Sequence, residues 1–288
     1  MTAPGRIDAH HHFWDPADFD YPWMAGEALD PIRRPFAPVD IAPELATNAI
    51  DGTVLVQTVA DLRETTRFLD LAAGTAFIRG VVGWVDLTDG AAGQTIADLR
   101  QRAPGTLVGI RHQVHDEPDA DWLDRDDVQA GIRTVGNAGL AYDLLVRTRE
   151  LPAAIRLVSG FADQRFVLDH IAKPPILSGW SDEWARLIGD LARRPNVAVK
   201  LSGMITEASW DEWSPDSLRP YVDHVLHAFG TERVLFGSDW PVCLLAASRY
   251  GEVVDAVETL LGGLSDTERA DAFGGNAVRW YQLADVAA

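Results

Sequence analysis

The chain has 288 residues, and its 43 acidic against 25 basic side chains give a net charge of −18. So large an acidic excess argues against nucleic acid or an anionic membrane surface as the partner, because both require a basic face. The sequence has one cysteine, Cys243, and no run of about 18 apolar residues, which argues against an intramolecular disulfide and a membrane-spanning helix.

The first strand-like run, residues 7–14, carries three consecutive histidines. Side chains alternate between the two faces of a strand, so His10 and His12 are expected on one face and His11 on the other. Two imidazoles aimed into one cavity form half of a metal site or a polarising pair. The 15–38 segment that follows is long for a connection and rich in aromatic residues. It is therefore expected either to form a wall for a substrate or to be pinned onto the protein by its own aromatic side chains.

Short apolar runs alternate with helical runs along the rest of the chain. The strand-like runs are poorly alternating, as expected for parallel strands that are buried on both faces. With the first run, they are 7–14, 52–57, 77–85, 107–113, 140–146, 166–170, 197–203 and 234–237. The helical runs between and after them are 43–49, 61–73, 91–102, 126–138, 151–160, 181–194, 220–229, 250–261, 266–273 and 277–283. This order predicts a (β/α)8 TIM barrel, an α/β fold, as a single domain over residues 1–288.

In such barrels the active site lies at the carboxyl ends of the strands. Asp239, after the eighth strand, is the predicted general base, because a carboxylate can take a proton from water and hold that water in line. His10, His12 and His170 can bind a divalent metal or, uncharged, orient the same water.

Other polar and aromatic side chains at the same rim are predicted to contact the substrate. Cations there can hold a carboxylate or polarise a carbonyl, and the alternative for each cation is a structural ion pair. The predicted substrate-binding residues are Trp14, Trp23, Gln57, Arg111, Lys173, Lys200 and Trp240. His112 is expected to point away if Arg111 points in.

Several segments, in order along the chain, resemble the amidohydrolase superfamily and, within it, the amidohydrolase-related group of sugar-acid and dicarboxylate lactonases. The segments are IDAHHHFWD, YPW, LVQ, GIRH, FVLDHIAKP, VKLSG, FGSDWPV and GGNAVRWYQL, and they extend from residue 7 to residue 283. The resemblance implies a hydrolase that opens a small sugar-acid lactone of the L-fuconolactone kind. It implies that His10, His12, His170 and Asp239 carry out the attack of an activated water on the lactone carbonyl.

The resemblance also implies a metal site made by the same four residues. The fourth strand lacks the bridging Lys or Glu of two-metal members, and the fifth ends in Tyr142 and Asp143 without a His. One divalent ion is therefore expected, zinc by its ligand types. Metal-free catalysis stays open, because some relatives of the group resemble metal-free hydrolases.

Three other functions stay open: decarboxylation, hydrolysis of a dicarboxylate lactone, and binding of a small ligand without turnover. The expected partner is a small-molecule lactone or sugar acid, with no nucleic acid and no membrane, and a homo-oligomer is left open. The N-terminus has no basic patch followed by an apolar stretch, so a cytoplasmic location is expected.

Overall fold

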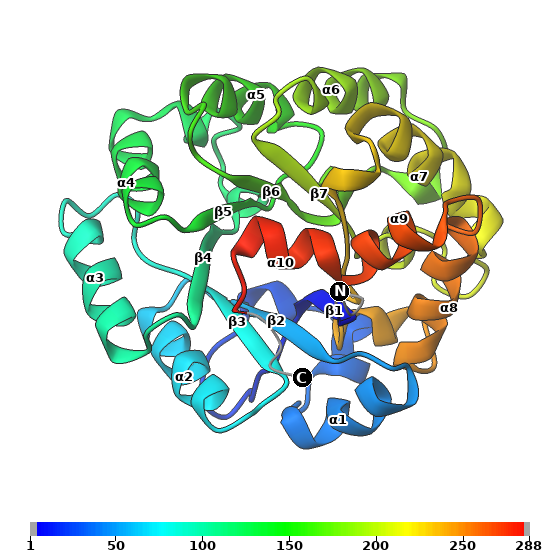
Figure 1. The fold of residues 1–288 in the computed structure, drawn as a ribbon, viewed down its shortest axis with the longest axis horizontal. Coiled ribbons are helices and arrows are strands. Elements are labelled where there is room, and N and C mark those ends of the chain that lie inside the picture. The colour runs from blue at the N-terminus through cyan, green and yellow to red at the C-terminus, as the bar shows by residue number, and fades with distance from the viewer. Residues whose placement is uncertain (1–4, 285–288) are drawn as a thin grey trace.

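A computed structural model describes residues 5–284 and shows eight parallel strands in one sheet, in the order β1 to β8 (Figure 1). The strands are β1 Ile7–His11, β2 Gly52–Val56, β3 Ile78–Gly83, β4 Leu107–His112, β5 Ala141–Leu144, β6 Phe166–Leu168, β7 Val197–Leu201 and β8 Val234–Phe236. Each lies within its predicted run. The sheet closes where Asp239 N donates to His10 O at 2.8 Å and His12 N donates to Trp240 O at 2.7 Å. The predicted (β/α)8 barrel is therefore confirmed.

Helices surround the sheet as an outer ring (Figure 1). The ring consists of α1 Pro38–Thr47, α2 Leu62–Ala73, α3 Ala92–Arg102, α4 Asp126–Asn137, α5 Leu151–Gly160, α6 Asp182–Ala192, α7 Pro215–Phe229 and α8 Tyr250–Leu260, and α9 Asp266–Ala270 and α10 Asn276–Tyr281 follow it in the chain. Two predicted starts were wrong: α1 begins at Pro38 and α7 at Pro215, each five residues before the expected start. Both prolines occupy the first helical turn, where the missing N–H has no intrahelical partner to lose. Pro43 and Pro220, which mark the predicted starts, lie inside the helices.

The interior of the barrel is filled by small apolar side chains from every strand, which meet α10. This cluster consists of Ile7, Ala9, Val54, Val56, Val82, Val108, Ala141, Val167, Ala198, Leu235, Ala277, Tyr281 and Leu283. Helix α10 lies at the amino ends of the strands, because Asn276 Nδ2 donates to Val234 O at 2.7 Å and Arg165 Nε donates to Trp280 O at 2.9 Å. Figure 1 shows it crossing the centre of the barrel. The opposite end, at the carboxyl ends of the strands, is left for chemistry.

The segment between β1 and α1 packs onto the barrel through its aromatic residues. It contains two short 3₁₀ turns, Pro22–Met24 and Glu27–Ile32. An antiparallel bridge joins Trp14 to Phe36 and ties its two ends together. Among residues 5–284, no helix is long and apolar enough to cross a bilayer.

Candidate active site

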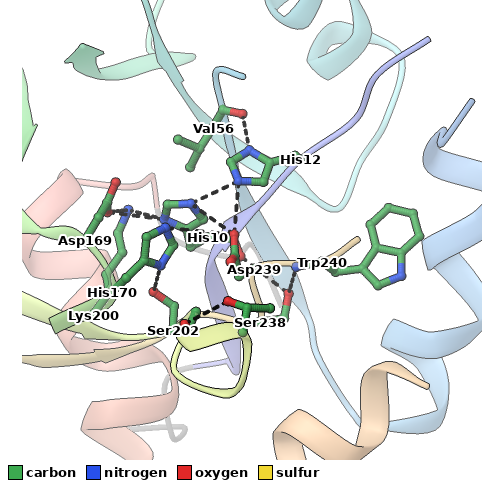
Figure 2. A network of polar contacts seen from close by, with 12 residues as sticks. His10, His12, Val56, Asp169, His170, Lys200, Ser202, Ser238, Asp239 and Trp240 are labelled. Carbon is green, nitrogen blue, oxygen red and sulfur yellow. Dashed lines mark hydrogen bonds and ion pairs between the residues drawn. The ribbon is translucent and has the colours of Figure 1, made fainter. Parts of the chain in front are cut away.

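Three imidazoles and one carboxylate meet at the carboxyl end of the barrel (Figure 2). The Nε2 atoms of His10 and His12 lie 3.1 Å apart. The Asp239 Oδ1 atom lies 3.2 Å from His12 Nε2, 3.8 Å from His10 Nε2 and 3.9 Å from His170 Nε2. All four residues are buried. The structure thus brings together the four residues that the sequence singled out as a catalytic or metal-binding set.

The turn that carries Asp239 is held by a buried carboxylate on β1. Asp8 accepts hydrogen bonds from Ser238 N at 2.9 Å, Ser238 Oγ at 2.6 Å and Tyr250 OH at 3.0 Å. Ser238 Oγ in turn accepts from Trp240 N at 3.0 Å, so the residues on both sides of Asp239 are fixed (Figure 2). Burial raises the pKa of Asp8 to about 6, although the bonds from Ser238 oppose the rise. Asp239 itself has a left-handed backbone, with φ of 57°.

His170 is aimed inward by an unusual turn after β6. Residues 170–173 all have positive φ, with His170 at 53°. Such conformations are uncommon for non-glycine residues. The Nδ1 atom of His170 lies 2.8 Å from Ser202 Oγ, which fixes the ring from the neighbouring strand. Gly203, with φ of 58°, makes room for the ring, because a Cβ at this position would lie 2.6 Å from His170 Nδ1.

The imidazoles are held in the neutral form. Burial lowers the pKa of His10, His12 and His170, since the charged form loses its hydration. The Nδ1–H of His12 donates to Val56 O at 2.8 Å, so its Nε2 carries the lone pair. His10 Nδ1 lies 3.2 Å from Asp169 Oδ1, and Arg111 Nη1 lies 3.2 Å from His10 Nε2.

Below the imidazoles lies a fully buried ion network. Lys200 Nζ lies 2.7 Å from Asp143 Oδ2, 2.9 Å from Asp169 Oδ1 and 3.1 Å from His10 Nδ1. Tyr281, which reaches up from α10, donates to Asp143 Oδ2 at 2.6 Å. Burial would raise the pKa of Asp169, but Lys200, His10 and Arg111 together hold it well below its usual range. An ionised Asp169 therefore orients the His10 ring from beneath.

Arg111 connects this network to the open side of the site. Its Nη1 donates to Asp169 Oδ2 at 3.0 Å and to His10 Nε2 at 3.2 Å, and its Nη2 donates to Gln57 Oε1 at 3.0 Å.

The donor set of neutral imidazole nitrogens and one carboxylate oxygen suits a divalent ion such as zinc. Ligand atoms of His10, His170 and Asp239 lie within 4.8 Å of one another, so one ion could contact all three. The residues present therefore fit a single metal ion.

A cavity of about 110 Å³ opens directly above this cluster. Its wall includes the predicted residues His12, Trp23, Arg111, His170, Lys173 and Asp239. It also includes Thr58, Gln113, His115, Leu145 and Val242, which were not among the predicted site residues. Thr58 directly follows the second predicted strand, so a wider window there would have found it, whereas Gln113 is the last residue of the fourth predicted strand. Asp169 was missed as well, because strand alternation places it opposite His170.

Four predicted substrate contacts lie elsewhere. Lys200 is in the buried network, and Gln57 is buried behind Arg111. Trp14 is 3% exposed and donates from Nε1 to Ile32 O at 3.0 Å. Trp240 packs edge-on against Phe36, with ring centroids 5.2 Å apart. As strand alternation predicts, His112 points away from the site and stacks on Trp122 at 4.3 Å.

Known proteins match this chain over nearly its whole length. A family profile described as amidohydrolase matches residues 7–283. The chain is 42% identical to an L-fucono-1,5-lactonase of Burkholderia ambifaria over 96% of each chain. It is 37% identical to an L-fucono-1,5-lactonase of Burkholderia multivorans over 98% of this chain and 97% of that protein. A crystal structure of an amidohydrolase from Burkholderia multivorans with bound zinc shares 36% identity, with a TM-score of 0.90 and coverage of 97% and 99% of the two chains.

Proposed function

The chain belongs to the amidohydrolase family, and from that premise we propose that it is a lactonase acting on a small sugar-acid lactone of the L-fucono-1,5-lactone class. One observation supports this most: the Asp239 carboxylate lies within 4 Å of three neutral imidazoles at the base of a small cavity. A carboxylate in this position can accept a proton from water, and neutral imidazoles can orient that water through their lone pairs.

The proposed reaction adds one water to one lactone. Asp239 takes a proton from the water while the oxygen of that water forms a bond to the acyl carbon. The bond between the acyl carbon and the ring oxygen then breaks, and the proton held by Asp239 passes to that oxygen, which becomes a hydroxyl group. The new acid releases its remaining proton to solvent and leaves as a hydroxycarboxylate. Arg111 and Lys173 line the cavity as cations and are proposed to stabilise the charge that develops on the carbonyl oxygen.

We propose that one divalent ion, zinc, is held by His10, His12, His170 and Asp239. When bound, such an ion polarises a carbonyl and lowers the pKa of water. Metal-free catalysis is supported by a different contact, since Arg111 Nη1 already donates to His10 Nε2 at 3.2 Å. A guanidinium in that place provides fixed positive charge beside the reacting atoms.

A pH-indicator assay with a panel of sugar-acid lactones, including L-fucono-1,5-lactone, tests the proposed activity. Release of acid from a lactone is expected, whereas bicarbonate formation from an aromatic acid would indicate a decarboxylase, and thermal stabilisation without turnover would indicate binding alone. Asp239→Asn should lower kcat by on the order of a thousandfold with the fold intact. Asp216→Asn changes the same charge at a side chain that is 95% exposed and serves as the control. Retention of more than a tenth of wild-type kcat in Asp239→Asn would remove this residue from the mechanism.

A further inference from the structure

A second cavity, of about 640 Å³, opens beside the catalytic pocket and shares Lys173 with it. Its wall is built from the loops that follow β5, β6 and β7, at the same end of the barrel as the active site. Its charged lining residues are Arg147, Arg149, Lys173 and Glu207, and we call it the basic cavity. Three cations and one carboxylate form an unusual surface on a chain whose net charge is −18.

The carboxylate in the basic cavity is already matched by two cations. Lys173 Nζ lies 2.8 Å from Glu207 Oε1, and Arg147 Nη1 lies 3.1 Å from Glu207 Oε2. Burial would raise the pKa of Glu207, but Lys173 and Arg147 hold it below its usual value, so this group is ionised and both of its oxygens are engaged. The Arg147 side chain is 48% exposed, and a guanidinium has five N–H donors, of which one is directed at Glu207. Arg149 pairs with the buried Glu150, so the excess donors of the cavity come from Arg147 and Lys173.

The positive field of these residues reaches the catalytic pocket. His115 lines that pocket, and burial together with Lys173, Arg147 and Arg111 lowers its pKa to about 3, although Glu207 opposes this. Lys173 itself forms part of both walls. A negative charge that appears above Asp239 is thus repelled by that carboxylate and attracted toward the basic cavity.

Opening a lactone creates such a charge. The ring is neutral, whereas the product carries a carboxylate and is longer once the ring has opened. Ligand sites usually have volumes of about 300–1,000 Å³. The volume of the catalytic pocket, about 110 Å³, is below that range, and the volume of the basic cavity, about 640 Å³, is inside it. We propose that the basic cavity binds the carboxylate of the ring-opened hydroxy acid as it leaves, with Arg147 and Lys173 as its ligands. This inference rests on the proposed lactonase function.

Inhibition of lactone hydrolysis by L-fuconate, and by the neutral polyol L-fucitol, tests the inference. Arg147→Gln should raise the inhibition constant of L-fuconate about fivefold. Its kcat/KM for the uncharged lactone and its inhibition constant for L-fucitol should stay within twofold of wild type. Glu207→Gln should have the opposite effect and lower the inhibition constant of L-fuconate, because it removes negative charge at nearly constant shape. A purely structural role would weaken binding in both variants.

Arg102→Gln is the matched control, because Arg102 is also half-exposed and paired with one carboxylate, Asp70, on the outer surface. It should change neither inhibition constant. The inference is overturned if Arg147→Gln leaves the L-fuconate constant unchanged, if L-fuconate and L-fucitol shift equally, or if L-fuconate does not inhibit the wild type. Turnover of the lactone by the wild type is a separate measurement. If turnover is absent, the proposed function fails. Calorimetric titration of L-fuconate into wild type and Arg147→Gln still measures the dissociation constant of L-fuconate at the basic cavity.

Discussion

Gly203 lies directly against the ring of His170, and replacing it with alanine is the most direct test of the site's geometry. A methyl group at this position would lie 2.6 Å from His170 Nδ1 and 3.1 Å from Asp239 Oδ2. Ordinary contact begins near 3.4 Å, so the imidazole would have to move by about 0.8 Å. Alanine at a positive φ adds a backbone cost of roughly 1–2 kcal/mol.

We therefore expect Gly203→Ala to remain folded with its unfolding free energy lowered by roughly 1–2 kcal/mol. Its kcat/KM should fall about a hundredfold, because misplacing a catalytic group by about 1 Å has an effect of that order. Lactone hydrolysis by pH indicator, together with thermal and denaturant unfolding, measures both quantities. Gly189→Ala is the matched control: it lies in α6, and a Cβ there has nothing within 4 Å.

The control should retain wild-type kcat/KM and gain up to about 1 kcal/mol of stability, as expected for alanine in place of glycine within a helix. A folded Gly203→Ala variant with more than a third of wild-type kcat/KM would refute the reasoning. In that case the position of the His170 ring does not govern the reaction.

Three further predictions concern the metal, the aromatic loop and a buried glutamate. Elemental analysis of protein purified without a histidine tag should find one equivalent of zinc per chain. Two equivalents of metal would contradict the single site. Absence of metal, with full activity in the presence of a chelator, would establish metal-free catalysis. Trp14→Ala should lower the unfolding free energy by about 3–5 kcal/mol, because the ring is buried. Trp23 lies in the pocket wall, so Trp23→Ala should mainly lower kcat/KM, about tenfold. If the two variants changed stability and kcat/KM equally, this division would be contradicted. Burial raises the pKa of Glu64 from its usual 4.5 to about 7, so the folded protein keeps a proton that the unfolded chain has lost. Stability should therefore fall by up to about 3 kcal/mol as pH rises from about 4.5 through 7, and denaturant unfolding of Glu64→Gln should show a flatter curve over that range.

The barrel could be predicted from the sequence because its strands are buried on both faces. A parallel strand covered on one side by helices and on the other by the barrel interior has few polar residues, and β2, whose five residues are all buried, is an example. Helix starts were less predictable, since a proline such as Pro43 or Pro220 is tolerated inside a helix when the surrounding packing favours it. Tertiary contacts then override the local preference.

The four central residues of the site were predictable because each lies at the carboxyl end of a strand. How deep a side chain lies within the barrel is not encoded in strand alternation. Lys200 points inward, as expected, but it lies below His10 and forms ion pairs with Asp143 and Asp169 in place of the expected contact with substrate. Asp169 and its neighbour His170 both point inward because the chain turns left-handed at His170, which the residue types there do not signal.

The seam between β8 and β1 has a consequence for how the protein is made. It joins His12 to Asp239, which are 227 residues apart in the chain. His10 and His12 are synthesised well before Asp239, so a nascent chain carries an incomplete site until the eighth strand docks. Two fragments separated anywhere between α1 and β8 would each lack part of the site, and turnover is expected only when they assemble. Catalytic activity therefore indicates that β8 has paired with β1 and that the barrel is closed.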